Sequence, residues 1–409
     1  MKKVLLIIML ITALTLGAVE VFIVNSTSET LTKLDTETGV VNNNFASLGL
    51  YTNRIALTED FGYIVNSGDN TLQKVSLDNG QTLATILVAA GCNPYDLIIE
   101  GQYAYVSGLL TSKVYKINLE TESVVAEVMV GASPTGMAIA ENKLYVANSG
   151  SYPNYANASV SVINLDTFTV LTTINIDPNA QYIQLIDGQL HVACSSAWGV
   201  NGGTIKVINP ETDSVTNTIT LGGYLGNIWS ANNGKVYVAD GNNAGLYAYN
   251  ITDYSPIYTF TESFPTPGSL VSGTTNSIFI VDSMWGSNGV LKVFNLAEEF
   301  QQEYTLGMSP TDIKVRHSST SSQDVTAPQF KVSVYPNPFS SCITINADTK
   351  SNDKLDFTCY DIRGRKVLAQ KVSSSSGTLN TESLPNGVYF YKISKSGREL
   401  ATGKILKVR

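Results

Sequence analysis

The sequence predicts an all-β fold in two parts, a seven-bladed β-propeller followed by a small antiparallel β-sandwich. A short phrase recurs seven times at nearly fixed intervals in the first three quarters of the chain. The remaining part lacks this phrase and holds a second set of alternating apolar and polar segments. Charge marks the same division, because residues 19–329 carry a net charge of −17 and residues 330–409 a net charge of +7.

The recurring phrase begins with an aromatic residue, continues with small or β-branched residues, and ends on Asn, Asp or Ser and a small residue. Its successive copies start 41, 42, 40, 46, 46 and 42 residues apart, which is the length of one four-stranded propeller blade. The copies start at Phe22, Tyr63, Tyr105, Tyr145, His191, Tyr237 and Phe279. The histidine that replaces an aromatic residue in the fifth copy is therefore expected to be buried and structural.

A segment with the period-two alternation of a β-strand lies ahead of six of the phrases, with its large residue eight positions before the aromatic residue, and a seventh such segment is aligned by its Pro-Thr-Asp lead-in (residues 310–312). Its large residues are Ile55, Leu97, Met137, Ile183, Trp229, Val271 and Ile313. The residues that follow them are mostly small, namely Ala56, Ile98, Ala138, Gln184, Ser230, Ser272 and Lys314. Radially packed sheets need this interlocking of large and small side chains. Trp229 is therefore predicted to belong to the core rather than to a ligand site.

The two ends of the repeat array predict a closed ring. The chain enters at Glu20 directly on a phrase strand, with no innermost strand ahead of it. It leaves the array through SPTDIKVRH (residues 309–317), an innermost strand with no phrase after it. These two halves complete one blade and remove the exposed sheet edge. The alternative, an open solenoid, would need capping repeats at both ends, and none is visible.

The YVxN phrase, followed by SVINLDT-like and VxxTIxVGxxP-like segments, resembles the YVTN-type repeats of seven-bladed propellers in bacterial surface and periplasmic proteins. The resemblance covers about residues 20–317. The turns at residues 91–94, 131–134 and 307–310 match the pattern of the family well. The blades that start near Tyr182, Gly226 and Pro267 depart from it. The resemblance implies a propeller domain over residues 19–317 but names no ligand.

Residues 1–18 are predicted to form a secretory signal peptide. Lys2 and Lys3 supply the positive charge, Val4–Leu16 supplies the apolar run, and the last residues are small. The alternative is a transmembrane anchor, but the apolar run is shorter than the roughly 20 residues that span a bilayer. No other stretch is long and apolar enough to span, so we expect no transmembrane segment after signal removal.

A Ser/Thr-rich linker is predicted at residues 318–329, and a sandwich at residues 330–409. The motifs YPNP, YDIRGRKV, LPNGVYFYKI and GKILKVR follow one another up to the C-terminus. Their order resembles the C-terminal sorting domain of the type IX (Por) secretion system. The residues that match are Tyr335, Pro336, Asn337, Pro338, Asp361, Gly364, Gly387, Tyr389 and Lys404.

This second resemblance implies the type IX secretion machinery as a partner and a final location that is secreted or on the outer cell surface, reached through the periplasm. It also implies removal of the domain and attachment of the product to lipopolysaccharide. The alternative is a generic sandwich such as a fibronectin-like binding module. Strand alternation points Cys342 outward and Cys359 inward, so free thiols are expected here rather than a disulfide.

The sequence contains no recognisable catalytic constellation. Neither His191 nor His317 has a metal-binding spacing, and there is no GxSxG motif, P-loop or Rossmann fingerprint. We therefore expect no enzymatic activity, no cofactor and no metal. The acidic propeller argues against nucleic-acid binding. The alternative is a lactonase-like hydrolase or lyase, for which the innermost strands offer only Asp96 and Asp312, opposite Arg54.

The clearest functional indication lies in the loops between the second and third strands, which emerge on one face of a propeller. Three of them are enlarged, at residues 148–158, 194–203 and 282–289. Aromatic residues in polar loops bind sugars, peptides or proteins at small entropic cost. The candidate ligand-binding residues are Tyr152, Tyr155, Trp198, Trp285, Tyr224, Asp240 and Asp282. Neighbouring loops add Tyr51, Tyr95 and Phe264.

Two simpler interpretations of these loops stay open. The aromatic rings would then fold down over the blade rims, and Asp240 and Asp282 would support their loops or bind a cation. On balance the sequence predicts a secreted or surface-attached propeller that acts as a non-catalytic binding or scaffold module for a protein or glycan ligand. The alternatives are the propeller hydrolase or lyase and a purely structural surface-layer component.

Overall fold

The computed structural model describes residues 19–197, 199–243, 245–283, 286–317, 332–347, 354–361, 365–373, 377–395 and 398–408. The chain divides into two compact units, residues 1–322 and residues 323–409. The predicted signal peptide and linker lie outside the described residues, and so do Trp198, Trp285 and Gly364. The part of the chain that is described contains no helix that is long and apolar enough to cross a bilayer.

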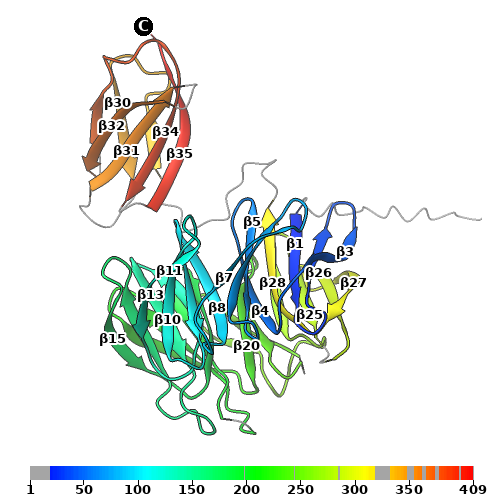
Figure 1. Ribbon diagram of the computed structural model, residues 1–409. Coiled ribbons are helices and arrows are strands. Elements are labelled where there is room, and N and C mark those ends of the chain that lie inside the picture. The colour runs from blue at the N-terminus through cyan, green and yellow to red at the C-terminus, as the bar shows by residue number, and fades with distance from the viewer. Residues whose placement is uncertain are drawn as a thin grey trace, which may run out of the picture. The chain divides into compact units, whose positions relative to one another are not determined.

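The first unit is built from antiparallel four-stranded sheets, the blades, which Figure 1 shows from blue to yellow. Blade 1 comprises β28 (Pro310–His317), β1 (Val19–Asn25), β2 (Thr30–Asp35) and β3 (Val41–Ser47). Blade 2 comprises β4 (Thr52–Leu57), β5 (Phe61–Asn66), β6 (Thr71–Ser76) and β7 (Thr82–Leu87). Blade 3 comprises β8 (Pro94–Glu100), β9 (Tyr103–Gly108), β10 (Lys113–Asn118) and β11 (Ser123–Met129).

Four further blades continue the ring in chain order. Blade 4 comprises β12 (Pro134–Ala140), β13 (Lys143–Asn148), β14 (Ser159–Asn164) and β15 (Thr169–Asn175). Blade 5 comprises β16 (Ala180–Ile186), β17 (Gln189–Cys194), β18 (Thr204–Asn209) and β19 (Ser214–Thr220). Blade 6 comprises β20 (Leu225–Ser230), β21 (Lys235–Asp240), β22 (Leu246–Asn250) and β23 (Pro256–Tyr258). Blade 7 comprises β24 (Leu270–Gly273), β25 (Ser277–Asp282), β26 (Asn288–Asn295) and β27 (Phe300–Met308).

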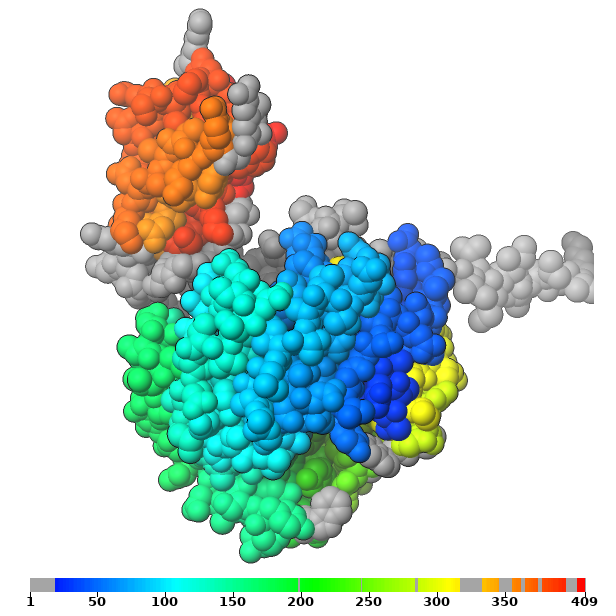
Figure 2. Space-filling view, in the orientation of Figure 1, coloured from blue at the N-terminus to red at the C-terminus, as the bar shows by residue number. Residues whose placement is uncertain are grey.

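Blade 1 is shared between the two ends of the repeat array, which confirms the predicted closed ring. Strand β28 pairs antiparallel with β1, from Val19 opposite His317 to Val24 opposite Asp312. The blue N-terminal blade accordingly lies beside yellow residues in Figure 2. The innermost strand of this blade is thus contributed from almost 300 residues downstream, and the ring has no open sheet edge at its seam.

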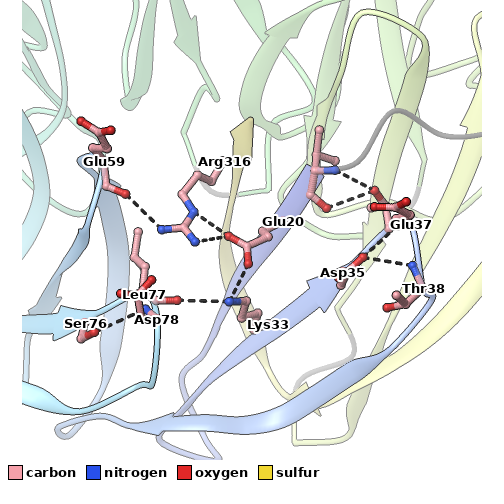
Figure 3. Close-up of polar contacts among 12 residues, drawn as sticks. Glu20, Lys33, Asp35, Glu37, Thr38, Glu59, Ser76, Leu77, Asp78 and Arg316 are labelled. Atoms are coloured by element: carbon pink, nitrogen blue, oxygen red, sulfur yellow. Dashed lines mark hydrogen bonds and ion pairs between the residues drawn. The ribbon is translucent and has the colours of Figure 1, made fainter. Parts of the chain in front are cut away.

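A cluster of charged side chains crosses this seam (Figure 3). Glu20 on β1 accepts a hydrogen bond of 2.6 Å from Nε of Arg316 on β28, and its other oxygen lies 2.6 Å from Nζ of Lys33 on β2. Arg316 and Lys33 also donate to the carbonyl oxygens of Glu59 and Leu77 in blade 2, at 3.0 and 3.1 Å. The Glu20 carboxylate therefore connects the first and last strands of the repeat array. Through Lys33 and Arg316 it also connects them to blade 2.

Serine hydroxyls of the recurring phrase join four of the blades to the next blade. Each donates a hydrogen bond to a backbone carbonyl at the start of the next innermost strand, and a buried hydroxyl without a partner would be costly. The four pairs are Ser67 with Pro94, Ser107 with Thr135, Ser195 with Leu225, and Ser283 with Pro310, at 2.5, 2.9, 2.5 and 2.9 Å. In these four blades the phrase therefore contributes to the contact with the next blade.

The aromatic residue of the phrase is buried in all seven blades, and His191 is buried in the same way, as expected. Nδ1 of His191 lies 2.5 Å from the hydroxyl of Tyr249 in blade 6, and the two rings are stacked. Tyr145 makes the corresponding contact to Asp213 of blade 5, at 2.6 Å. Burial lowers the pKa of His191 to about 4, so the imidazole is neutral at pH 7.

The strand position expected for Trp229 is off by one residue, although its ring packs against a buried core cluster and stacks on Tyr237. Trp229 lies opposite Tyr237, in the position that Ala56 takes opposite Tyr63 in blade 2, and Ile228 fills the large core position instead. The cause is a β20–β21 hairpin that is one residue longer than in the other blades. Trp229 is half-buried, lines the central channel, and has room because a Cβ on Gly273 would lie 2.6 Å from its ring.

The second unit is a small sandwich of two antiparallel sheets around one core. One sheet contains β29 (Val332–Tyr335), β30 (Cys342–Ala347) and β33 (Gly377–Asn380). The other contains β32 (Lys366–Ser373), β31 (Lys354–Asp361), β34 (Gly387–Lys395) and β35 (Arg398–Lys407). Cys342 is exposed and Cys359 is buried, and both thiols are free, as the alternation predicted.

The contacts of Glu20 with Arg316 and Lys33 lead to a first prediction. We expect Glu20→Gln to lower the free energy of unfolding by about 1–2 kcal/mol, because two partly buried cations lose their shared carboxylate. Thermal unfolding at low and high salt measures this loss, which should shrink as salt screens the charges. Glu37→Gln, which removes an equal charge from an exposed side chain at the end of β2, is the control. Equal shifts in the two variants would contradict the role of Glu20.

A second prediction concerns pH. Unfolded His191 gains its proton near pH 6.5, whereas the folded side chain gains it near pH 4. Between these values the unfolded state binds more protons, so the free energy of unfolding falls as pH falls, by at most about 3 kcal/mol. His191→Phe, which restores the residue type of Phe22 and Phe279, should remove this component. Denaturant titrations at pH 7 and pH 4 test it, and unchanged pH slopes would refute it.

Candidate functional site

One face of the propeller gathers the loops between second and third strands together with the connections between blades. In blade after blade the residue that follows the second strand donates its backbone N–H to the preceding interblade connection. These bonds join Ser67 to Tyr51, Ser149 to Ser133, Ser195 to Asn179, and Gly241 to Tyr224, at 3.1, 3.0, 2.9 and 2.7 Å. We call this surface, formed by those loops and connections, the loop face.

The enlarged loop of blade 4 presents two tyrosines on the loop face. A bridge between Ser151 and Ala156 pins the base of this loop. Tyr152 is 80% exposed, whereas Tyr155 is half-buried, and their rings meet edge to face with centroids 6.2 Å apart. Burial, together with the neighbouring hydroxyl of Tyr224, raises the pKa of Tyr155. The loop therefore packs Tyr155 partly against the protein and leaves most of the Tyr152 side chain exposed to a partner.

A chain of polar contacts runs from Tyr224 towards the central channel. Asn179, which is fully buried, donates a 3.0 Å hydrogen bond from Nδ2 to the Tyr224 hydroxyl and accepts one from Gln181. The Tyr95 hydroxyl donates to Oε1 of Gln181 at 3.3 Å, and the Tyr95 ring faces the Arg54 guanidinium. These contacts fix Tyr224 and Tyr95 in the floor of the loop face.

The other aromatic candidates divide between the surface and the core. Tyr51 is 68% exposed on the loop face. Phe264 is buried against Tyr258 and Phe294, so for this residue the simpler interpretation, a ring folded onto the blade rim, is correct. Phe260, in the connection between β23 and β24, is exposed and was missed because this blade departs from the repeat. Trp198 and Trp285 lie outside the described residues.

Asp240 and Asp282 both accept hydrogen bonds from side chains or backbone of their own region. Asp240 is buried and accepts from the Tyr247 hydroxyl and from the backbone N–H of Asn242, the latter at 2.7 Å. Asp282 accepts from Nδ2 of Asn243 at 2.6 Å and lies 3.4 Å from Nζ of Lys292. These contacts join the loops of blades 6 and 7 and occupy the oxygens that a cation would need.

The central channel contains a cavity of about 430 Å³. The seven innermost strands line it, and its most deeply buried charged residues are Arg54 and Asp312. Apolar and polar side chains share its walls. The apolar ones include Leu57, Ile98, Met137, Ile183, Trp229 and Val271, and the polar ones include Gln184, Asn227 and Ser272. Lys314, with a side chain 46% exposed, reaches Asp312 with Nζ 3.1 Å from Oδ1. The channel thus offers both charged groups and apolar side chains to a ligand.

The two channel aspartates link neighbouring innermost strands. Asp312 accepts the backbone N–H groups of Ile313 and, across the blade boundary, Ile55, each at 3.0 Å. Asp96 accepts the N–H groups of Leu97 and of Met137 in the next blade, at 2.9 and 3.0 Å. These carboxylates therefore act first as ties between blades. Among the described residues, no three His, Cys, Asp or Glu side chains are grouped to hold a metal ion.

The same surroundings shift the pKa values of the charged channel groups. Burial raises the pKa of Asp96, and the positive charges of Arg54 and Lys314 partly offset this effect. Burial also lowers the pKa of Arg54, but Tyr182, Asp312 and the other channel groups more than compensate and raise it above its ordinary value. Arg54 is therefore charged at any physiological pH.

In the second unit the motif residues meet around strand β35. Asn337 donates to the carbonyl of Lys404 at 3.0 Å and accepts the N–H of Leu406 at 2.9 Å, so the YPNP motif is tied to the terminal strand. Asp361 accepts from the Arg365 side chain at 2.8 Å. Pro336 and Pro338 flank Asn337 in this motif.

The remaining motif residues belong to β34 and β35. Tyr389 is buried and donates its hydroxyl to the carbonyl of Pro385, and Gly387 begins the same strand. The side chain of Lys404 is exposed. Lys407, which the sequence did not single out, is buried and donates to the carbonyl oxygens of Thr381 and Glu382 at 2.5 and 3.2 Å. Strand alternation from Ile405 could have found it.

Known proteins resemble the two units separately. Residues 333–408 match the family model described as the secretion system C-terminal sorting domain. The propeller is similar in fold to hydrazine synthase of Kuenenia stuttgartiensis, at 11% identity and a TM-score of 0.51, over 65% of this chain and 95% of that one. It is also similar to the WD40 β-propeller domain of Doa1, at 14% identity and a TM-score of 0.52, over 64% and 86% of the two chains.

No curated protein matches the chain by sequence. The two structural similarities lie far below 25% identity, so they describe the fold alone. The sorting domain, in contrast, has a defined role, because it directs secretion to the cell exterior. The chain is therefore a β-propeller protein that carries a Por secretion C-terminal sorting domain and is exported by the type IX secretion machinery to be secreted or held at the cell surface.

Proposed function

We propose that the propeller is a non-catalytic binding or scaffold module that engages a glycan or protein partner with its loop face. The observation that carries the proposal is the pair of exposed tyrosines, Tyr152 and Tyr51, on loops whose bases are hydrogen-bonded to the blades. A rigid exposed tyrosine offers a large contact area and a polar hydroxyl at small entropic cost. Trp198 and Trp285, in the other enlarged loops, complete the proposed face.

The state of the carboxylates supports binding over hydrolysis. A carboxylate that acts as a general acid or base has to lie within reach of a substrate proton. Asp240 and Asp312 are buried and accept hydrogen bonds from the protein, and Asp96 and Asp282 are likewise engaged by neighbouring groups. These four aspartates thus hold loops and blades together. A lactonase-like centre would require these residues to exchange their present partners.

The export route is part of the proposal. Residues 1–18 act as the signal peptide that brings the chain to the periplasm, and the sorting domain then takes it across the outer membrane. The domain is removed and the propeller is attached to lipopolysaccharide, so its loop face is presented outside the cell. The repeats are assigned to the YVTN type on the recurring phrase, which fits a surface location.

The loop face generates a third prediction. The secreted protein is screened on glycan and peptide arrays, and its best partner is titrated against variants. Tyr152→Ala, and Trp198→Ala combined with Trp285→Ala, should each weaken binding by about tenfold or more, because buried aromatic contacts dominate such interfaces. Phe300→Ala, which removes a ring 54% exposed on the outermost strand β27, is the control and should have little effect. Binding that survives all loop-face changes would disprove the proposed face.

A fourth prediction concerns export. Mass spectrometry of surface protein should find chains that begin after residue 18 and lack residues 333–408, together with a mass increase from lipopolysaccharide. A variant truncated after residue 332 should accumulate in the periplasm, because it lacks the sorting domain. An exported chain that still ends at Arg409 would contradict removal of the domain. Surface display of the truncated variant would contradict its role in sorting.

A further inference from the structure

The central channel contains a buried cation that the protein itself leaves largely unsatisfied. The Arg54 side chain lines the 430 Å³ cavity and is only 7% exposed. Of its five N–H donors, one finds an acceptor among the described residues, the carbonyl oxygen of Thr311 at 2.7 Å. No described carboxylate forms an ion pair with it. Buried charges in proteins are normally paired, so this guanidinium has capacity for a further partner.

Aromatic rings hold the guanidinium in place without using its donors. Its central carbon lies 4.4 Å from the centroid of the Tyr182 ring and 5.7 Å from that of Tyr95. A guanidinium that lies over an aromatic face keeps its N–H groups at its edges, in the fork that matches a carboxylate. Since Tyr182 belongs to blade 5 and Arg54 to blade 2, the contact also positions the charge across the channel.

The aspartates in the channel do not neutralise Arg54 directly. Asp312 and Asp96 belong to the two blades beside that of Arg54 and their charges raise its pKa. Their oxygens accept backbone N–H groups of Ile55 and Met137, and Lys314 also contacts Asp312. A mobile counter-ion or ligand can approach Arg54, because the cavity continues from it along the apolar wall that contains Trp229. The volume lies in the range of small-molecule sites in proteins.

We propose that the central channel binds a small organic acid, whose carboxylate is held by Arg54 and whose apolar part lies against the wall formed by Ile98, Met137 and Trp229. A carboxylate accepts two parallel N–H bonds from the guanidinium edge, which uses donors that have no acceptor among the described residues. The half-buried Trp229 ring offers a flat apolar surface to the rest of the ligand. This site shares Tyr95 with the floor of the loop face but does not depend on the function proposed for that face.

Benzoate is the probe for the site, and calorimetry on the full chain is the measurement. We expect saturable binding of benzoate, and binding at least about tenfold weaker for benzamide, which has the same shape without the charge. Phenyl phosphate distinguishes a carboxylate site from a phosphate site. Tighter binding of phenyl phosphate than of benzoate would overturn the assignment to organic acids, and the absence of saturable binding of both anions would overturn the site.

Two kinds of variant locate the binding. Arg54→Lys keeps the charge but loses the planar fork, and Arg54→Met loses both, so affinity should fall in that order. Ser272→Phe fills the cavity from blade 7 while Arg54 and its contacts remain, and it should abolish binding. Leu83→Phe, on the exposed outermost strand β7, is the control and should bind benzoate like the unchanged protein.

The variants also separate loss of binding from loss of fold. Thermal unfolding of each variant is measured beside the titration, since Arg54 contacts residues of blades 1, 3 and 5. If Arg54→Met does not fold, Arg54→Lys and Ser272→Phe decide the question. Unchanged benzoate binding in a folded Ser272→Phe protein would show that the ligand lies outside the channel and would overturn the proposal.

Discussion

The pairing of β28 with β1 is the constraint on which the rest of the propeller depends. It brings residues almost 300 positions apart into one sheet and so closes the ring within blade 1. Loop-closure entropy opposes such a long-range pairing, so it has to be compensated by strong local contacts. The carboxylate of Glu20, shared by Arg316 and Lys33, provides contacts of this kind at the seam.

Closure of the ring also creates both candidate sites. Each blade touches two neighbours through the same phrase, so the seven innermost strands stand around one channel and the seven sets of loops gather on one face. Ties such as those of Asp96 and Asp312 hold the strands at fixed spacing. The result is a rigid support, in which the positions of Tyr152 and Arg54 are set by blades far from either residue in sequence.

The regular parts of this architecture could be predicted because each repeat has the same local sequence pattern. Period, alternation and the offset ends led to seven blades and a closed ring, and the alternation of Cys342 and Cys359 was also correct. Predictions were least accurate where the repeat changes length. One extra residue in the β20–β21 hairpin moved Trp229 from the core to the channel wall, and a displaced loop in the same region buried Phe264.

The sequence by itself determined the fold class, the division into two units and the C-terminal sorting domain. The fold class depends on patterns within about 40 residues, and the sorting domain depends on the order of its motifs. Only the tertiary structure decided which polar residues have their hydrogen-bond partners within the protein and which can still bind a ligand. Asp240 and Asp96 have partners in the protein, whereas Arg54 has a single acceptor among the described residues. The number of hydrogen-bond partners of each residue depends on contacts between blades, where residues from distant repeats meet. Local sequence patterns therefore cannot predict it.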